Sequence, residues 1–217
     1  MKNKHQNNKN VISPEIDYDR RDFLKKMGLL GGGIIVYCTI GNPLKSAAQF
    51  GGPTPDFNAF LRIGTDERVT CFIGKVDMGQ GTITSFPLIV ADDLDVAYDS
   101  VDMIMGDTEK CPWDIGTGGS MGIRILGVQL RAATAEAKGV LKELAAEYLK
   151  CPLENLQTKE GMVFDKTNPG KKVSYGTLTK GKIIEKHLDP KPPVTPPADF
   201  KHIGKPYFHQ DFRAKQL

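Results

Sequence analysis

The spacing of apolar and polar residues divides this chain into alternating extended and helical segments. Two apolar runs flank the polar tetrapeptide GTDE between Phe60 and Lys75, a pattern typical of a β-hairpin. Apolar residues that recur every three or four positions from Ile83 to Leu94 predict a helix. The same spacing continues for much longer between about Gly122 and Lys150, which predicts a long helix with one buried face.

Shorter apolar segments complete the pattern. We expect strands at Val101–Asp107, Leu156–Lys159 and Met162–Asp165, and a short final helix within residues 174–187. Ser174 is a suitable N-cap for that helix. The predicted fold class is therefore α+β, in which a β-hairpin and a short mixed sheet pack against one long helix and one or two shorter helices.

Glycine and proline mark the boundaries of the folded part. Residues 49–57, QFGGPTPDF, are predicted to be a linker, and residues 58–186 to form one α+β domain. Residues 187–217 begin with a proline-rich segment, so we expect an extended tail that acts as a tether. Of the four histidines, three lie in this tail, where we expect them to be solvated, and none has metal-ligand spacing.

The first 48 residues have the features of an export signal. Arg20 and Arg21 precede the apolar, glycine-rich run Leu29–Ile40, and the small residues Ser46 and Ala48 follow it. This order is typical of a twin-arginine signal cleaved after about Ala48, so residues 1–48 predict a periplasmic protein. The apolar run is short for a membrane span, which needs about 20 residues. An uncleaved leader that anchors the chain to the membrane remains an alternative.

Charge and cysteine content exclude some function classes. Residues 1–48 hold eight of the 29 Lys and Arg residues and four of the 26 Asp and Glu residues, so the remainder has a net charge of −1. No basic face for nucleic acid follows from that balance. The four cysteines contain no C-x-x-C pair, so this chain alone is not expected to hold an iron–sulfur cluster or zinc. Cys71 is expected in the core, although one disulfide among the mature cysteines is also open.

Two glycine-rich turns are the candidate ligand-binding segments. MGQGT, Met78–Thr82, and GTGGSMG, Gly116–Gly122, each join a predicted strand to a predicted helix. Backbone N–H groups at such helix starts suit an anion, and Arg124 lies one turn further on. Neither turn matches a Rossmann or P-loop motif, and glycine-rich turns can also be purely structural. Because the twin-arginine route exports folded proteins, the leader favours a chain that holds, or assembles with, a cofactor.

The ordered combination of these segments resembles a known family. GKVDMGQGTITSFPLIVADDLDV at Gly74–Val96 and DIGTGGSMGIR at Asp114–Arg124, before a long helix, resemble the molybdenum hydroxylases related to xanthine dehydrogenase and aldehyde oxidase. The nearer match is the isoquinoline 1-oxidoreductase beta-subunit type. NAFLRIG at Asn58–Gly64 and ADFKHIGKP at Ala198–Pro206 extend the resemblance over nearly the whole mature chain.

The resemblance implies a role for each glycine-rich turn. Gln80 matches the glutamine that hydrogen-bonds an oxo ligand of molybdenum, and Gly79 and Gly81 leave room for the cofactor. The second turn matches the segment that lines molybdopterin or its cytosine dinucleotide form. The residues implied to bind the cofactor are Gly79, Gln80, Gly81, Gly116, Thr117, Gly118, Gly119, Ser120 and Arg124.

Relatives of this type run several hundred residues longer, and their general-base glutamate lies in the later part. Glu136, Glu143 and Glu147 of the long helix are expected to be solvated rather than catalytic. The resemblance therefore implies part of a split hydroxylase that oxidises an aldehyde or N-heterocycle with water-derived oxygen. Its partners would be a second molybdopterin-binding chain, carrying the hammerhead domain and the catalytic glutamate, and a 2Fe-2S subunit. The alternative is a non-catalytic envelope binding or assembly protein, or a truncated relic of the family.

Overall fold

The computed structural model describes residues 33–38, 59–112, 114, 116–179 and 193–210. The predicted linker at residues 49–57 lies outside the described residues. So do most of the predicted leader and the second half of the predicted final helix. Within the described part, the chain folds into two sheets and a set of helices that together confirm the α+β prediction.

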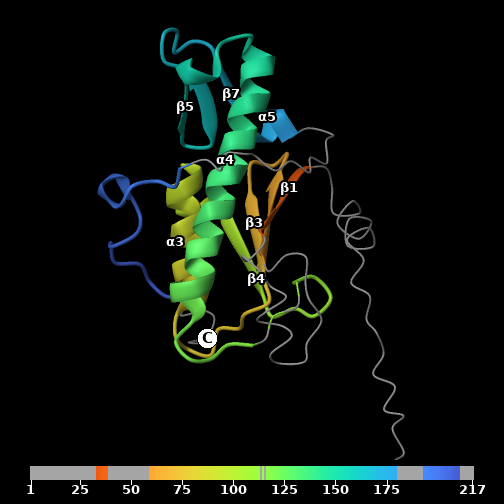
Figure 1. The fold of residues 1–217 in the computed structure, drawn as a ribbon, viewed down its shortest axis with the longest axis vertical. Coiled ribbons are helices and arrows are strands. Elements are labelled where there is room, and N and C mark those ends of the chain that lie inside the picture. Colours follow the sequence, from red (N-terminus) through yellow and green to blue (C-terminus); the bar gives the residue numbers. More distant parts are fainter. Residues whose placement is uncertain (1–32, 39–58, 113, 115, 180–192, 211–217) are drawn as a thin grey trace, which may run out of the picture.

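The larger sheet is mixed, as expected. Its order is β1 (Gly33–Cys38), β2 (Ala59–Gly64), β3 (Val69–Ile73) and β4 (Val101–Met105), as Figure 1 shows. The pairs β1–β2 and β2–β3 are antiparallel, and β3–β4 is parallel. The hairpin prediction is confirmed by β2 and β3. Strand β1 was not predicted, because its residues fall within the apolar run of the expected export signal.

Helix α3 (Thr82–Leu94) makes the crossover between the parallel strands β3 and β4. The long predicted helix is present, but it starts differently from the expectation. Residues Gly122–Gly127 form a π-helix, η2, and only then does α4 (Val128–Leu149) begin. A hydrophobic period cannot distinguish a π-turn from an α-turn over six residues, so no pattern in the sequence indicates it.

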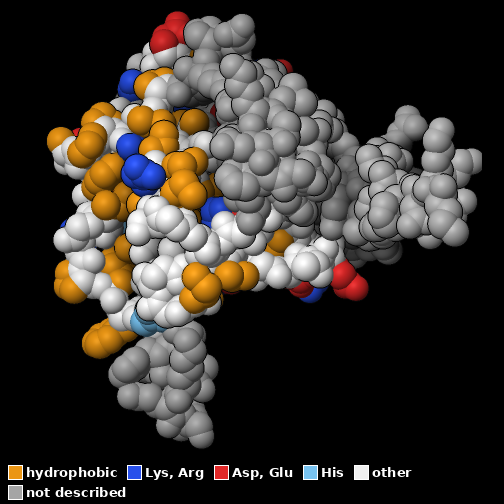
Figure 2. Space-filling view, turned by 60° about the horizontal axis from the view of Figure 1, so that its bottom comes forward, with side chains coloured by type: hydrophobic (Ala, Val, Ile, Leu, Met, Phe, Trp, Pro, Cys, Tyr) orange, Lys and Arg blue, Asp and Glu red, His pale blue; other side chains and the backbone are white. Residues whose placement is uncertain are grey.

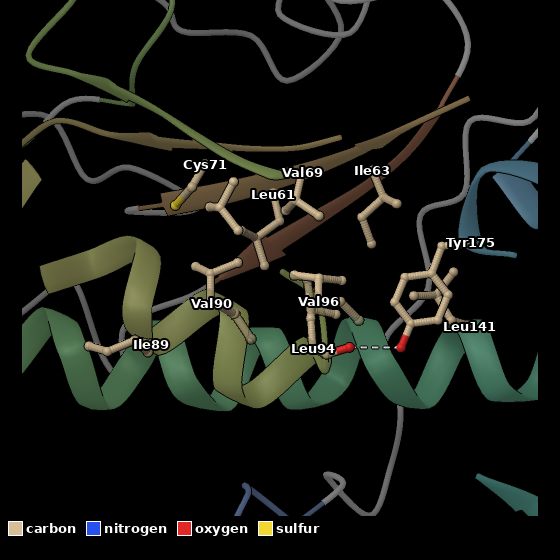
Figure 3. Packing of buried hydrophobic residues seen from close by; sticks show 14 of the residues in the cluster. Leu61, Ile63, Val69, Cys71, Ile89, Val90, Leu94, Val96, Leu141 and Tyr175 are labelled. Carbon is tan, nitrogen blue, oxygen red and sulfur yellow. Dashed lines mark hydrogen bonds between the residues drawn. The ribbon is translucent and has the colours of Figure 1, made fainter. Parts of the chain in front are cut away.

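The core lies between the large sheet and the two helices. In Figure 3, side chains from β2 and β3 point toward Ile89, Val90 and Leu94 of α3, with α4 alongside. Tyr175 is buried at one end of this core, and its hydroxyl donates a 2.7 Å hydrogen bond to the carbonyl of Leu94. Burial raises the pKa of Tyr175 far above its ordinary value, so the group stays a neutral donor.

The smaller sheet packs at the far end of α4 (Figure 1). It consists of β5 (Leu156–Lys159), β6 (Met162–Asp165) and β7 (Lys172–Ser174), all antiparallel, followed by α5 (Tyr175–Thr179). The predicted strands β5 and β6 are confirmed. The Ser174 hydroxyl accepts a 3.3 Å hydrogen bond from the Thr177 N–H, which confirms the predicted cap. Strand β7 is three residues long, which is too short for an alternation pattern to reveal.

One predicted solvated residue of α4 is buried instead. Glu136 is 6% exposed, whereas Glu143 is half-buried and Glu147 is exposed. The prediction was wrong for Glu136 because α4 contacts both α3 and β2, so residues 133–137 are enclosed on every side. The buried Cys71 and Cys111 and the half-buried Cys151 are free thiols, which confirms Cys71 as a core residue.

The tail residues 195–210, here called the C-terminal strap, lie along α3 (blue in Figure 1). Asp92 on α3 accepts hydrogen bonds from the backbone N–H groups of Lys201, His202 and Ile203, at 2.8, 2.9 and 2.8 Å. Near the start of α3, the Thr84 hydroxyl accepts a 2.9 Å bond from the N–H of Gln210. The strap therefore runs back along α3 from its C-terminal to its N-terminal end.

Two further contacts fix the strap. Buried Asp93 pairs with Arg131 at 3.0 Å and accepts a 3.0 Å bond from the N–H of Thr195. The ring of His202 is hydrogen-bonded through Nδ1 to the Tyr207 hydroxyl at 2.6 Å. A solvated tether with solvated histidines was expected. The difference arises because the acidic pair on α3 supplies acceptors for the strap's backbone, which no local pattern reveals.

We expect the stability of the domain to fall in acid because of Asp95, at the end of α3. Burial raises the pKa of Asp95, but hydrogen bonds from Lys138 (2.5 Å), Lys201 (2.8 Å) and Thr158 (2.6 Å) outweigh this and hold it below its ordinary value. The stabilisation is therefore present above the unfolded-state pKa of about 3.9 and is lost as pH falls through the lower, folded value.

Urea unfolding at pH 7, 5 and 3, compared with Asp95→Asn, measures this contribution. The wild-type chain should lose more stability between pH 5 and pH 3 than the variant does. Equal losses in both proteins would contradict the assignment.

Candidate functional site

The first glycine-rich turn is organised around Asp77. Its carboxylate accepts hydrogen bonds from the N–H groups of Gly79 (2.7 Å) and Ile83 (2.8 Å) and from the hydroxyl of Thr82 (3.2 Å). Burial raises the pKa of Asp77, but these donors outweigh burial and hold it below its ordinary value. The positive end of α3 is thus capped from within the chain. The expectation that this helix start offers its N–H groups to an external anion was wrong for the first turn of α3.

Gln80 is held by its own turn. Its Oε1 accepts a 2.6 Å hydrogen bond from the N–H of Met78, and its Nε2 donates to the carbonyl of Val76 at 3.0 Å and the hydroxyl of Thr82 at 3.1 Å. Since the Thr82 hydroxyl in turn donates to Asp77, the three side chains form one chain of hydrogen bonds. The amide is exposed, and both of its N–H groups are used inside the turn.

The second turn is anchored by Lys75, at the end of the hairpin. The buried Lys75 ammonium donates to the Asp114 carboxylate at 2.5 Å and to the Gly116 carbonyl at 2.6 Å. The N–H of Gly116 donates to the same carboxylate at 2.8 Å. A buried lysine is tolerated here because its charge is paired and hydrogen-bonded. This pairing fixes where the second turn begins relative to the first.

Thr117 links the second turn to Val76, two residues before the first turn. Its hydroxyl accepts a 2.8 Å hydrogen bond from the N–H of Val76 and donates a 3.2 Å bond to the Val76 carbonyl. Gly74 allows this approach, because a Cβ there would lie 2.4 Å from the Pro112 carbonyl oxygen. The two turns therefore lie side by side at one end of the domain, the lower end in Figure 1.

Both turns present bare backbone. A Cβ added at Gly79, Gly116 or Gly118 would meet nothing within 4 Å, so these glycines are not required by packing inside the chain. Positive φ values of 100° and 114° account for Gly79 and Gly116, but not for Gly118. Within the described residues, the N–H groups of Gly118, Gly119 and Ser120 donate to no protein acceptor.

The remaining predicted residues surround this surface. Gly81 is the N-cap of α3 with φ 79°, and Ser120, which is not a glycine, has φ 54°. Arg124 is exposed on η2, just after the second turn, and forms no ion pair with any residue that the structure describes. The two turns thus combine open backbone, one hydroxyl cross-link and one exposed cation.

His209 reaches the first turn, which sequence reasoning missed. A Cβ added at Gly81 would lie 3.5 Å from both Cδ2 and Nε2 of His209, so the half-buried imidazole packs over the start of α3. The strap delivers it there from the far end of the chain. Spacing along the sequence carries no signal of such a contact.

The described residues contain no group of three or more His, Cys, Asp or Glu side chains arranged to hold a metal ion. Among the helices that the structure describes, none combines the length and the apolar character needed to span a bilayer.

Comparison with known proteins places this arrangement in context. Residues 13–210 match the family model described as the molybdopterin cofactor-binding domain. The chain is 36% identical over 146 residues to a nicotinate dehydrogenase subunit of Pseudomonas putida, covering 67% of this chain and 12% of that protein. It is 26% identical over 202 residues to the beta subunit of isoquinoline 1-oxidoreductase of Brevundimonas diminuta, covering 87% of this chain and 25% of that protein.

Solved structures share the fold. Quinoline 2-oxidoreductase from Pseudomonas putida 86 superposes with a TM-score of 0.51 at 23% identity, covering 73% of this chain and 21% of that chain. CO dehydrogenase from Oligotropha carboxidovorans superposes with a TM-score of 0.54 at 21% identity, with the same coverage of both chains. This chain therefore spans a quarter or less of the length of these relatives.

Proposed function

This chain belongs to the molybdopterin cofactor-binding domain family, and from that premise we propose that it supplies one part of the molybdopterin site of a split hydroxylase. The observation that carries the proposal is the pair of adjacent turns whose bare backbone faces open space at Gly79, Gly116 and Gly118. A large, flat, anionic ligand needs such a surface, because side chains there would keep its phosphate away from the backbone N–H groups.

The second turn is the better phosphate contact. The N–H groups of Gly118, Gly119 and Ser120 have no acceptor within the described part of the chain, and the exposed Arg124 supplies a cation beside them. The first turn differs, because Asp77 already caps α3 and would repel a phosphate. We therefore assign the anionic part of the cofactor, molybdopterin or its cytosine dinucleotide form, to the second turn.

Gln80 is assigned to the reacting end of the cofactor. When bound, the molybdenum cofactor supplies the redox chemistry and takes up the electron pair that the substrate loses. The Gln80 amide adds a donor without adding charge. It can release the Thr82 hydroxyl at little cost, since that hydroxyl keeps its own bond to Asp77. Thr117 and the Lys75–Asp114 pair hold the two turns at a fixed separation, so that both ends of the cofactor are positioned together.

We propose that other chains supply the rest of the site. Glu136 is enclosed in the core and Glu147 is exposed on the distal half of α4, so neither is offered as the general base. We assign that glutamate to a second molybdopterin-binding chain with the hammerhead domain, and electron transfer to a 2Fe-2S subunit. The substrate class is an aldehyde or N-heterocycle. Export to the periplasm by the twin-arginine route is part of the same proposal, supported by Arg20 and Arg21 before the apolar run.

Metal and nucleotide analysis of the complex purified from its own host tests this function. We expect molybdenum in the purified complex, together with an organic phosphate. Release of cytidine monophosphate on mild acid hydrolysis would identify the dinucleotide form. An intact complex that contains its partner chains but no molybdenum would overturn the proposal and favour a non-catalytic assembly protein of the envelope.

A further inference from the structure

Gly81 is covered by the C-terminal strap, whereas Gly79 in the same turn faces open space. A Cβ added at Gly79 would meet nothing within 4 Å, but one at Gly81 would lie 3.5 Å from both Cδ2 and Nε2 of His209. Among the described residues, only His209 and the immediate neighbours of Gly81 along the chain come within 4 Å of that position. Figure 2 brings this end of the molecule forward and shows a histidine side chain, in pale blue, at its surface. The strap therefore places a side chain against a residue that has none.

Gly81 is the residue at which the first turn becomes a helix. Its φ of 79° is left-handed, and its carbonyl accepts hydrogen bonds from the N–H groups of Thr84 at 3.1 Å and Ser85 at 3.0 Å. The Ser85 hydroxyl donates to the same carbonyl at 3.0 Å. Glycine adopts this conformation easily but also leaves it easily, because it has no Cβ to restrict φ. A ring packed against Gly81 limits that freedom, and the residue before Gly81 is Gln80.

The position of His209 is fixed by contacts on both sides of it along the strap. The N–H of the next residue, Gln210, donates to the Thr84 hydroxyl at 2.9 Å. Two residues before His209, the ring of Tyr207 packs against Tyr98, with the ring centroids 4.5 Å apart. Both neighbours are thus tied to other parts of the domain by contacts that do not involve the imidazole. His209 is held over the start of α3 even if its own contact with the turn is weak.

We propose that the C-terminal strap positions the first turn, with His209 as the positioning residue that holds Gly81 and, through it, the Gln80 amide. The consequence for the cofactor rests on the proposed function, whereas the link between strap and turn rests on the contacts above. At its other end the strap is held by Asp92, which accepts three of its backbone N–H groups. Because one continuous segment joins the two ends, release of the strap from Asp92 should loosen the first turn as well.

Amide hydrogen exchange of the protein purified from its own host, with any chains bound to it, tests this link. His209→Ala should speed exchange at residues 83–85 about fivefold, because one ring contact is lost while the Asp77 cap remains. The matched control is Phe208→Ala, at the adjacent strap residue, which is 89% exposed; exchange there should stay at the wild-type rate. His209→Phe keeps a flat ring over Gly81 and should stay within about twofold of wild type. Exchange in β2 and β3 should be the same in every variant, which shows that each variant is folded.

Asp92→Ala provides a second test, because it releases the strap from its other end. This variant should also speed exchange at residues 83–85. In the double variant with His209→Ala, the combined effect should be smaller than the product of the two, since both act through the same contact. Multiplicative effects, or unchanged exchange at residues 83–85 in His209→Ala, would overturn the proposal. A His209→Phe variant that exchanges as fast as His209→Ala would also overturn it, because the ring would then not act by covering Gly81.

Turnover of the assembled enzyme separates this inference from the proposed function. If the strap positions Gln80 for the reaction, His209→Ala should lower kcat about fivefold while KM and molybdenum content stay unchanged, since a loosely held donor is misplaced for part of the time. Faster exchange at residues 83–85 with an unchanged kcat would overturn the positioning role. A wild-type complex without molybdenum would overturn the proposed function, and the exchange measurements would still decide whether the strap holds the turn.

Discussion

Replacing Gln80 with alanine is expected to lower kcat of the assembled enzyme about 100-fold, with little change in KM. The loss of one preorganised donor at a reacting centre typically costs two to three orders of magnitude in rate. This expectation depends on the amide facing the cofactor during the reaction. In the structure the amide instead donates to Val76 and Thr82, so a purely structural role within the turn is the competing explanation.

Thr82→Val separates the two explanations. The substitution removes the hydroxyl that accepts from Gln80 and donates to Asp77, so it loosens the same turn but keeps the amide. If Gln80 acts on the cofactor, Gln80→Ala should keep its molybdenum and lose turnover, while Thr82→Val loses much less turnover. A fall in molybdenum that parallels the fall in kcat, or equal effects of both variants, would contradict a role in the reaction.

Replacing Asp92 with alanine is expected to lower the free energy of unfolding by about 3 kcal/mol. One buried carboxylate accepts three backbone hydrogen bonds from Lys201, His202 and Ile203. Hydrogen bonds to a charged group contribute about 1.5–3 kcal/mol each, and buried donors left without an acceptor carry a further penalty. The estimate is lower than the sum because the strap can peel from α3 and recover hydrogen bonds to water.

Urea unfolding and amide hydrogen exchange together measure this effect. Exchange at residues 201–203 should become much faster in Asp92→Ala, because the strap would open without global unfolding. Asp199→Ala, an exposed residue of the same strap, is the control and should change stability by less than about 0.5 kcal/mol. Unchanged exchange at residues 201–203 in Asp92→Ala would show that other contacts hold the strap.

The elements that could be predicted from sequence are those defined by local periodicity. The hairpin of β2 and β3 and the helices α3 and α4 have long, regular apolar patterns, and each packs one face on a common core. Strand β7 and the π-helix η2 escape such reasoning because they are too short to have a period. The position of the strap could not be predicted from local periodicity, because it depends on Asp92 and Asp93 of α3. Acidic side chains are normally expected at the surface, but these two are buried in the fold.

The candidate site was predicted in part. Both glycine-rich turns were identified from their residues, and the structure brings them together. The contacts that join them, Thr117 with Val76 and Lys75 with Asp114, link positions about forty residues apart and have no local signature. Nor could the sequence reveal that Asp77 occupies the start of α3, or that His209 packs over Gly81. These contacts depend on tertiary structure, because they join side chains to residues that local sequence patterns do not connect.

If the chain is exported as proposed above, strand β1 has a consequence for the timing of that export. Its residues Gly33–Cys38 pair with β2 along its full length, from Gly33 opposite Gly64 to Cys38 opposite Ala59, yet they also lie inside the apolar run behind the twin arginines. A translocase that binds this apolar run would compete with β2 for the same six residues. Proteolysis after about Ala48 would then remove β1, the outermost strand of the sheet. Strand β2 would become an edge strand, with backbone groups that have no strand partner on that side. Maturation of the leader and completion of the sheet would be mutually exclusive fates of one segment.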